Sequence, residues 1–204
     1  FFFMSNRALI VVDVQNDFVS GTLAVNESEG IVEKINTVRN KFDTVVFTKD
    51  WHPSDHCSFA KNHDKEPFSS IEYKGLPHTL WPVHCVQNTD GAKLHENLVV
   101  NEDDITFLKG TDKECECYSA FCDVFGKDTN FANSLKEKNI TEIYVCGLAL
   151  DYCVLQTALD GVKFGFKTLC IFDLTKGVDP NTSFKAVEKL LDSGVKIIHS
   201  NDVE

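Results

Sequence analysis

The sequence has no basic runs and no flexible linkers, and each absence excludes a class of protein. Its 204 residues include 20 Lys and Arg against 31 Asp and Glu, a formal net charge of −11, and no basic run is longer than a pair. The sequence therefore lacks the clustered positive charge that is typical of a nucleic-acid binder or an anionic-membrane binder. No Pro/Gly/Ser-rich stretch divides the chain, so we expect a single domain over residues 4–204.

From the sequence we expect neither a secretion signal nor stabilising disulfides. The apolar residues Phe1 to Phe3 precede Met4, are too few for a signal peptide and have no basic flank, so we expect residues 1–3 to lie outside the native fold. Hydrophobic residues make up 43% of the chain, enough for a full core without cross-links. We therefore expect the eight cysteines to be mostly structural, reduced thiols of a cytoplasmic protein, with the nucleus as a second location.

Short apolar runs rich in β-branched residues alternate with helical patterns along the chain. The runs predict strands at 8–14, 44–50, 104–110, 142–147, 167–173 and 195–200, and the patterns between them predict helices at 29–41, 129–138, 152–165 and 181–193. Asn or Ser residues are expected to cap these helices, and Gly194 to end the last one. This alternation predicts an α/β fold with a three-layer, six-stranded, mostly parallel sheet flanked by helices.

Polar side chains at the ends of the predicted strands are the first candidates for function, because ligands bind beyond the carboxyl ends of parallel strands. This rule selects Asp13, Asp50, Lys109 and the turn before Cys153. The stretch 51–103 shows little periodicity, which is unusual in a compact domain unless the segment builds a site.

Three of these residues could carry out nucleophilic catalysis together. Cys153 precedes a helical pattern, and a helix N-terminus would lower the pKa of its thiol and stabilise an oxyanion. Asp13 could take the thiol proton and pass it to a leaving amine, while Lys109 would offset the repulsion between carboxylate and thiolate. Taken singly, each has an ordinary interpretation: a buried thiol, a loop carboxylate and a surface ammonium.

A second group of residues has the chemistry of a metal site. Asp50 and His52 come at a strand end, and His84 lies in the long irregular region. Carboxylate and imidazole bind Zn, Fe or Mn, and three such ligands leave room for water or substrate. His56 is either a fourth ligand or a residue outside the ligand set. We expect one divalent ion, zinc before iron or manganese.

Five motifs, in this order, resemble the nicotinamidases of the isochorismatase-like cysteine hydrolases over nearly the whole chain. They are DVQNDF at 13–18, TKDWHP at 48–53, LWPVHCV at 80–86, FLKG at 107–110 and GLALDYCV at 147–154. The resemblance implies the family's fold and hydrolysis of nicotinamide to nicotinate and ammonia through a cysteine thioester, in NAD salvage.

The resemblance also implies a role for individual residues. The catalytic residues map to Asp13, Lys109 and Cys153, and the metal ligands map to Asp50, His52 and His84, with His56 matching an extra ligand of some members. A cis peptide would precede Ala149, the N–H groups of Ala149 and Cys153 would form the oxyanion hole, and Phe18, Trp81 and Tyr118 would enclose the ring. Tyr118 is the contact most open to change, because a charged, Cys-containing segment at 111–116 precedes it.

Two other functions remain open at this point. Another amide or ureido hydrolase, or an isochorismatase, of the same superfamily is the first, although the thiol argues against isochorismatase chemistry and the metal ligands argue against the metal-free amidases. The second is a zinc-binding or redox-sensing protein that uses Cys115, Cys117 and Cys122. Nicotinamide is the expected partner; homo-oligomerisation is left open, and no nucleic-acid or membrane partner is expected.

Overall fold

The computed structural model describes residues 6–204. The expectation that residues 1–3 lie outside the native fold concerns residues outside this range. The assignment of 4–204 to a single domain stays a prediction.

Six strands form one sheet in the order β5-β2-β1-β6-β7-β8, and all its pairings are parallel. The strands are β1 (Arg7–Val12), β2 (Thr44–Asp50), β5 (Ile105–Lys109), β6 (Glu142–Leu148), β7 (Lys167–Lys176) and β8 (Lys196–Ile198). The predicted six-stranded parallel sheet is confirmed. Helices connect the strands because a parallel pair needs a crossover longer than a tight turn.

The central strand β1 shows how one apolar run supplies both faces of the sheet. Residues 8–12 are all fully buried. Successive side chains of a strand point to opposite faces, so Leu9 and Val11 belong to one hydrophobic core while Ile10 and Val12 belong to the other.

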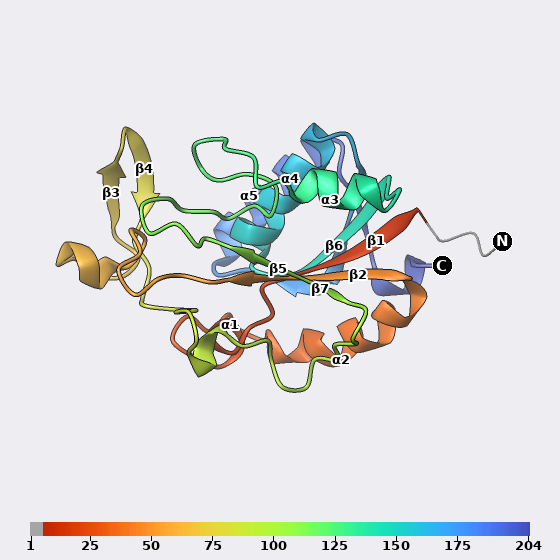
Figure 1. Cartoon of the computed structure of the whole chain (residues 1–204), viewed down its shortest axis with the longest axis horizontal. Helices are drawn as coiled ribbons and strands as arrows, with labels where there is room; N and C mark the ends of the chain where they lie inside the picture. Colours follow the sequence, from red (N-terminus) through yellow and green to blue (C-terminus); the bar gives the residue numbers. More distant parts are fainter. Residues whose placement is uncertain (1–5) are drawn as a thin grey trace.

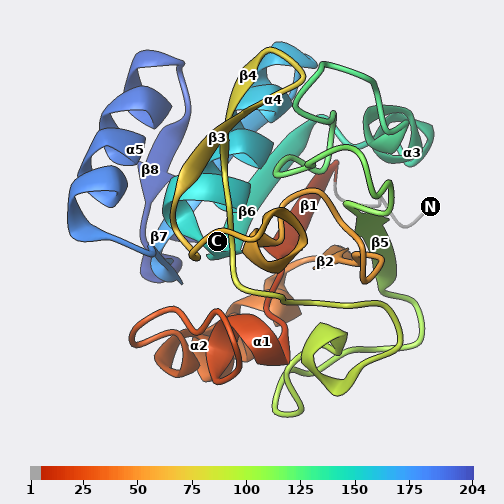
Figure 2. The same ribbon diagram turned by 90° about the vertical axis from the view of Figure 1, so that its left-hand side faces the viewer.

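Helices cover the two faces and complete three layers (Figures 1 and 2). On one side lie α1 (Asn16–Val19) and α2 (Glu29–Val38); on the other lie α3 (Phe131–Glu137), α4 (Leu155–Lys163) and α5 (Pro180–Asp192). The two cores lie between these layers and the sheet, so the carboxyl ends of the strands stay free for a site.

Three of the predicted helices needed correction in detail. The one expected at 152–165 is preceded by a π-helical turn, Leu150–Val154, and α4 begins only at Leu155. The one expected at 29–41 ends in a short 3-10 turn after Val38. The cap of α5 is Asp179, which accepts hydrogen bonds from two backbone N–H groups, although Asn and Ser were the expected capping residues. Gly194 follows α5 with a φ of +86°, as a helix stop requires.

The irregular region 51–103 folds over the carboxyl end of the sheet. It contains a two-stranded hairpin of β3 (Ser70–Tyr73) and β4 (Leu76–Thr79), which projects from the molecule at the end opposite the C-terminus (Figure 1). In Figure 2 this hairpin lies in front of the strand ends. The segment therefore covers the place where the candidate residues meet.

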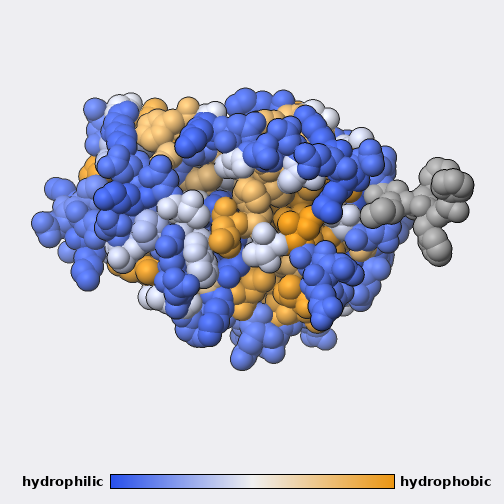
Figure 3. Space-filling view, in the orientation of Figure 1, coloured by the Kyte–Doolittle hydropathy of each residue, from blue (hydrophilic) through white to orange (hydrophobic). Residues whose placement is uncertain are grey.

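On the face shown in Figure 3 the surface is mainly hydrophilic, and apolar residues gather over its middle, near the edge strand β5. Leu108 of this strand is partly exposed. Among residues 6–204 there is no helix with the length and apolar character needed to cross a membrane.

Candidate active site

The structure brings Asp13, Lys109 and Cys153 together in the interior of the protein. The Lys109 Nζ atom lies 2.8 Å from Asp13 Oδ2 and 3.4 Å from Cys153 Sγ, and it also forms an ion pair with Asp50. None of the four side chains is more than 6% exposed. The simple interpretation of Lys109 as a solvated surface charge is therefore wrong.

Strand register explains why residues so far apart in sequence meet. Lys109 and Asp50 are paired residues at the ends of β5 and β2. Asp13 follows β1 with a φ of 49°, and its carboxylate accepts a hydrogen bond of 2.7 Å from the Thr48 hydroxyl of β2. Gly147 pairs with Val12, and a Cβ at this glycine would collide with the β1 backbone. The close approach of β6 to β1 therefore requires glycine there.

Burial and neighbouring charges set the protonation of Asp13 and Cys153. Burial raises the pKa of Asp13 to about 6, against the opposing effect of the Lys109 ammonium. Burial also raises the pKa of Cys153 well above its ordinary value; Lys109 opposes this, and the Asp13 carboxylate adds to it. The expected lowering of the thiol pKa is therefore wrong, because burial outweighs the effect of the single cation and two neighbouring carboxylates add to it.

Asp50, His52 and His84 meet in a geometry that fits a metal ion. One ligand atom from each lies within 4.8 Å of the others. The Nδ1 atoms of the two histidines lie 2.8 Å from the carbonyl oxygens of Gly110 and Pro82. A carbonyl oxygen only accepts hydrogen bonds, so each Nδ1 is the donor and Nε2 is left to face Asp50, as in histidines that bind metals.

The electrostatics of this trio also suit a cation. His52 Nε2 is buried and has no hydrogen-bond partner. Burial lowers the pKa of His84 to about 4, which keeps this imidazole neutral. Against the effect of burial, the Lys109 ammonium holds the pKa of Asp50 well below its ordinary value. A carboxylate and imidazoles with free nitrogens are the donor set of Zn, Fe or Mn.

His56 lies against the ring of His52, outside the group formed by Asp50, His52 and His84. Its ring stacks on His52 with 4.0 Å between centroids, and its two nitrogens contact Ser58 Oγ at 2.7 Å and the Cys115 carbonyl oxygen at 3.1 Å. It is absent from the groups of residues 6–204 that could hold an ion. The structure therefore places His56 as a support for the His52 ring.

An apolar pocket opens onto both groups of residues. All three side chains predicted to enclose the ring line it, and so do Ala149 and Cys153; the lining residues are Phe18, Leu23, Asp50, Trp81, His84, Glu116, Tyr118, Ala149, Tyr152, Cys153 and Val178. The indole of Trp81 donates a hydrogen bond of 3.1 Å to the Tyr118 hydroxyl. The predicted cis peptide is present between Leu148 and Ala149.

Sequence reasoning missed five residues at or next to this pocket, among them Leu23. Tyr152 adjoins Cys153, so its position could have indicated it, whereas nothing near Val178 in the sequence points to the site. Glu116 belongs to the charged segment 111–116, yet it is 3% exposed and accepts a hydrogen bond from the Cys117 N–H. Asp151 accepts hydrogen bonds from Val178 N, Asp179 N and the Thr182 hydroxyl, and so ties the turn that contains Cys153 to the start of α5.

The thiols other than Cys153 form no site among the described residues. All eight cysteines are free, as expected. The Sγ atoms of Cys115, Cys117 and Cys122 face backbone carbonyls or the Asp160 carboxylate, and none belongs to a group that could hold an ion. The zinc-binding alternative therefore has no support from geometry.

Comparisons with known proteins agree with this arrangement. The nicotinamidase of Acinetobacter baylyi is 42% identical over 203 residues, covering 98% of this chain and 95% of the relative. The solved nicotinamidase pyrazinamidease of Acinetobacter baumanii has a TM-score of 0.94 and 43% identity over 98% of each chain. The pyrazinamidase of Pyrococcus horikoshii, solved in complex with zinc, has a TM-score of 0.82 and 36% identity over 96% of this chain and 99% of its own. A model of the isochorismatase domain also matches residues 7–202, and with this match the chain belongs to the isochorismatase family.

Proposed function

We propose that this protein is a nicotinamidase, which hydrolyses nicotinamide to nicotinate and ammonia with Cys153 as the nucleophile. The observation that carries the proposal is the buried Asp13, Lys109 and Cys153 cluster, whose Cys153 lines an aromatic pocket. The similar proteins described above are named nicotinamidases, which supports the same substrate.

The pocket suits a small, flat, largely apolar amide. Phe18, Trp81 and Tyr118 would enclose the pyridine ring, so that its carboxamide faces Cys153. Asp50, His52 and His84 would hold one divalent ion, zinc before iron or manganese, whose positive charge would anchor the ring nitrogen. The ring and the carboxamide would thus be fixed at two separate points, which favours attack from one direction.

In the first half of the reaction, the Cys153 thiol adds to the amide carbon. Asp13, whose pKa burial raises to about 6, would take the thiol proton as the C–S bond forms. The N–H groups of Ala149 and Cys153 would stabilise the oxyanion. Asp13 then gives the proton to the amide nitrogen, the C–N bond breaks, and ammonia leaves behind a thioester.

In the second half, water adds to the thioester carbon. Asp13 takes a proton from the water as the C–O bond forms, and it returns this proton to the departing sulfur when the C–S bond breaks. Nicotinate and the Cys153 thiol are the products. Lys109 keeps its charge throughout, because the pKa of its ammonium is well above its ordinary value despite burial, owing to Asp13 and Asp50.

A kinetic test can separate this function from the ureido hydrolase alternative. We expect ammonia release from nicotinamide and little or none from N-carbamoyl amino acids. Cys153→Ala should lose this activity, whereas Cys170→Ala, which removes a buried thiol from β7, should keep it. Full activity of Cys153→Ala, or a preference for the carbamoyl substrates, would contradict the proposal.

The metal ligands can be tested by elemental analysis of purified variants. His84→Ala removes a proposed ligand and should lower the content of bound metal to near zero. His56→Phe keeps a flat ring against His52, and the ratio of metal to protein should stay that of the unaltered protein. If His56→Phe lost its metal while His84→Ala kept it, His56 and not His84 would be the ligand. The same measurement identifies the element.

A further inference from the structure

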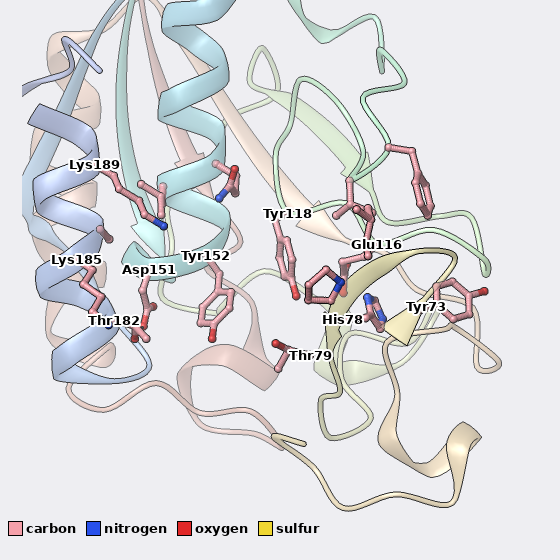
Figure 4. A pocket seen from close by; sticks show the side chains of 17 residues that line it. Tyr73, His78, Thr79, Glu116, Tyr118, Asp151, Tyr152, Thr182, Lys185 and Lys189 are labelled. Carbon is pink, nitrogen blue, oxygen red and sulfur yellow. The ribbon is translucent and has the colours of Figure 1, made fainter. Parts of the chain in front are cut away.

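A second, larger cleft lies beside the substrate pocket and takes no part in the proposed reaction. It has a volume of about 310 Å³ and lies between the β3–β4 hairpin and helices α4 and α5 (Figure 4). Glu116, Tyr118 and Tyr152 line both spaces, so these three side chains form the wall between them. The volume is at the lower end of the range for sites that bind small organic ligands.

Two unpaired cations stand on one side of this cleft. Lys185 and Lys189 are four residues apart on α5 and therefore project from the same helix face. Both line the cleft, in which Figure 4 shows them on the α5 side. Among residues 6–204 neither ammonium forms an ion pair, although the chain as a whole carries an excess of acidic residues.

The opposite side of the cleft holds a buried polar atom without a partner. His78 of β4 is 6% exposed, and its Nε2 atom has no hydrogen bond. The ring of Tyr73 packs against it with 5.3 Å between centroids, which fixes the imidazole at the cleft wall. A buried donor or acceptor without a partner destabilises a fold, so this nitrogen indicates a place for a ligand atom.

Two carboxylates, Asp151 and Glu116, also line the cleft, but neither forms an ion pair with Lys185 or Lys189. Asp151 accepts three hydrogen bonds from the segment 178–182. Glu116 accepts a hydrogen bond from the Cys117 N–H. Against the effect of burial, His52 and His56 lower the pKa of its carboxyl group. Both ammoniums are therefore free to contact an anionic ligand.

We propose that this cleft binds a nucleoside monophosphate, with its phosphate on Lys185 and Lys189 and the edge of its base on His78. Two neighbouring ammoniums are a common way to hold a phosphate. The aromatic rings of Tyr118 and Tyr152 offer faces on which a base can stack between the two polar ends. The site does not depend on the proposed amide hydrolysis, and its ligand need not react.

Calorimetric titration of the full chain with AMP, GMP, CMP and UMP tests this proposal. We expect saturable binding of at least one nucleotide, and much weaker binding of its nucleoside or of inorganic phosphate. The double variant Lys185→Ala/Lys189→Ala and the variant His78→Phe should each raise the Kd at least about tenfold. The double variant Lys34→Ala/Lys196→Ala is the control, because it removes the same charge from exposed lysines elsewhere, and it should leave the Kd within about twofold.

Other outcomes would overturn the proposal. These are the absence of saturable binding for all four nucleotides at millimolar concentration, an equal loss of affinity in the control, or no loss in either cleft variant. Displacement of the nucleotide by nicotinate would place it in the substrate pocket and would also reject the cleft. Because binding is measured without turnover, failure of this proposal is distinct from failure of the nicotinamidase proposal.

Discussion

Lys109 is the residue on which the charge balance of the site depends. It lies between the carboxylates of Asp13 and Asp50 and beside the thiol of Cys153. Without this cation, two carboxylates would face each other in a dry environment, and one of them would have to bind a proton. Asp13 could then no longer serve as the proton acceptor.

Replacing Lys109 should therefore abolish most of the activity. We expect Lys109→Met to lower kcat/KM by about 10² to 10³-fold, because the developing negative charge loses its nearest cation. Lys113→Met is the matched control, since its ammonium forms an exposed ion pair of 3.3 Å with Asp55 and should change kcat/KM by less than about twofold. Steady-state ammonia release measures both, and near-normal activity of Lys109→Met would contradict the assigned role.

At the level of elements, Asp151 links the π-helical turn of the nucleophile to the start of α5. Its carboxylate accepts hydrogen bonds of 2.9 Å and 3.2 Å from Val178 N and Asp179 N. Val178 in turn lines the substrate pocket. Gly177 precedes it, and a side chain at this glycine would collide with Ser183, so the connection between β7 and α5 has little room to move.

Removing this link should affect both stability and substrate binding. We expect Asp151→Ala to lower the free energy of unfolding by about 1 kcal/mol, since two part-buried N–H groups lose their acceptor, and to raise KM because Val178 is no longer held. Asp179→Ala removes only the helix cap and should cost about 1 kcal/mol without a change in KM. Denaturant unfolding measures the loss of stability, and steady-state kinetics separates the two variants. An unchanged KM in Asp151→Ala would leave Asp151 a purely structural role.

At the scale of the whole molecule, the irregular region covers the carboxyl ends of the sheet and keeps the site dry. Trp81 and His84 are buried there, although the segment contains little regular structure. The outer surface carries the acidic excess, a formal net charge of −11. Such a charge repels itself in the compact state, and salt screens this repulsion.

Stability should therefore rise with moderate salt. We expect a change from low to physiological NaCl to stabilise the fold by about 1 kcal/mol, which corresponds to a Tm increase of about 2 to 4 °C at this chain length. Lys196→Glu, at an exposed lysine of β8, makes the net charge more negative and should steepen the dependence. Thermal unfolding monitored by circular dichroism measures it, and a Tm that falls with added NaCl would contradict the expectation.

Much of the fold and several site residues could be predicted from the sequence alone. Apolar runs such as residues 8–12 identify buried parallel strands, because both faces of such a strand need hydrophobic side chains. The ends of these strands then selected Asp13, Asp50 and Lys109. These inferences rest on local patterns, and local patterns are written directly in the sequence.

Only the tertiary structure decided how these residues are surrounded. The burial of Lys109, the high pKa of the Cys153 thiol and the position of His56 behind His52 depend on distant segments that pack around them. Val178 reaches the pocket only because Asp151 holds its backbone N–H. The sequence determined which chemical groups were present and on which strands, whereas three-dimensional packing decided their solvation and neighbours, because desolvation and charge proximity arise between residues far apart in the chain.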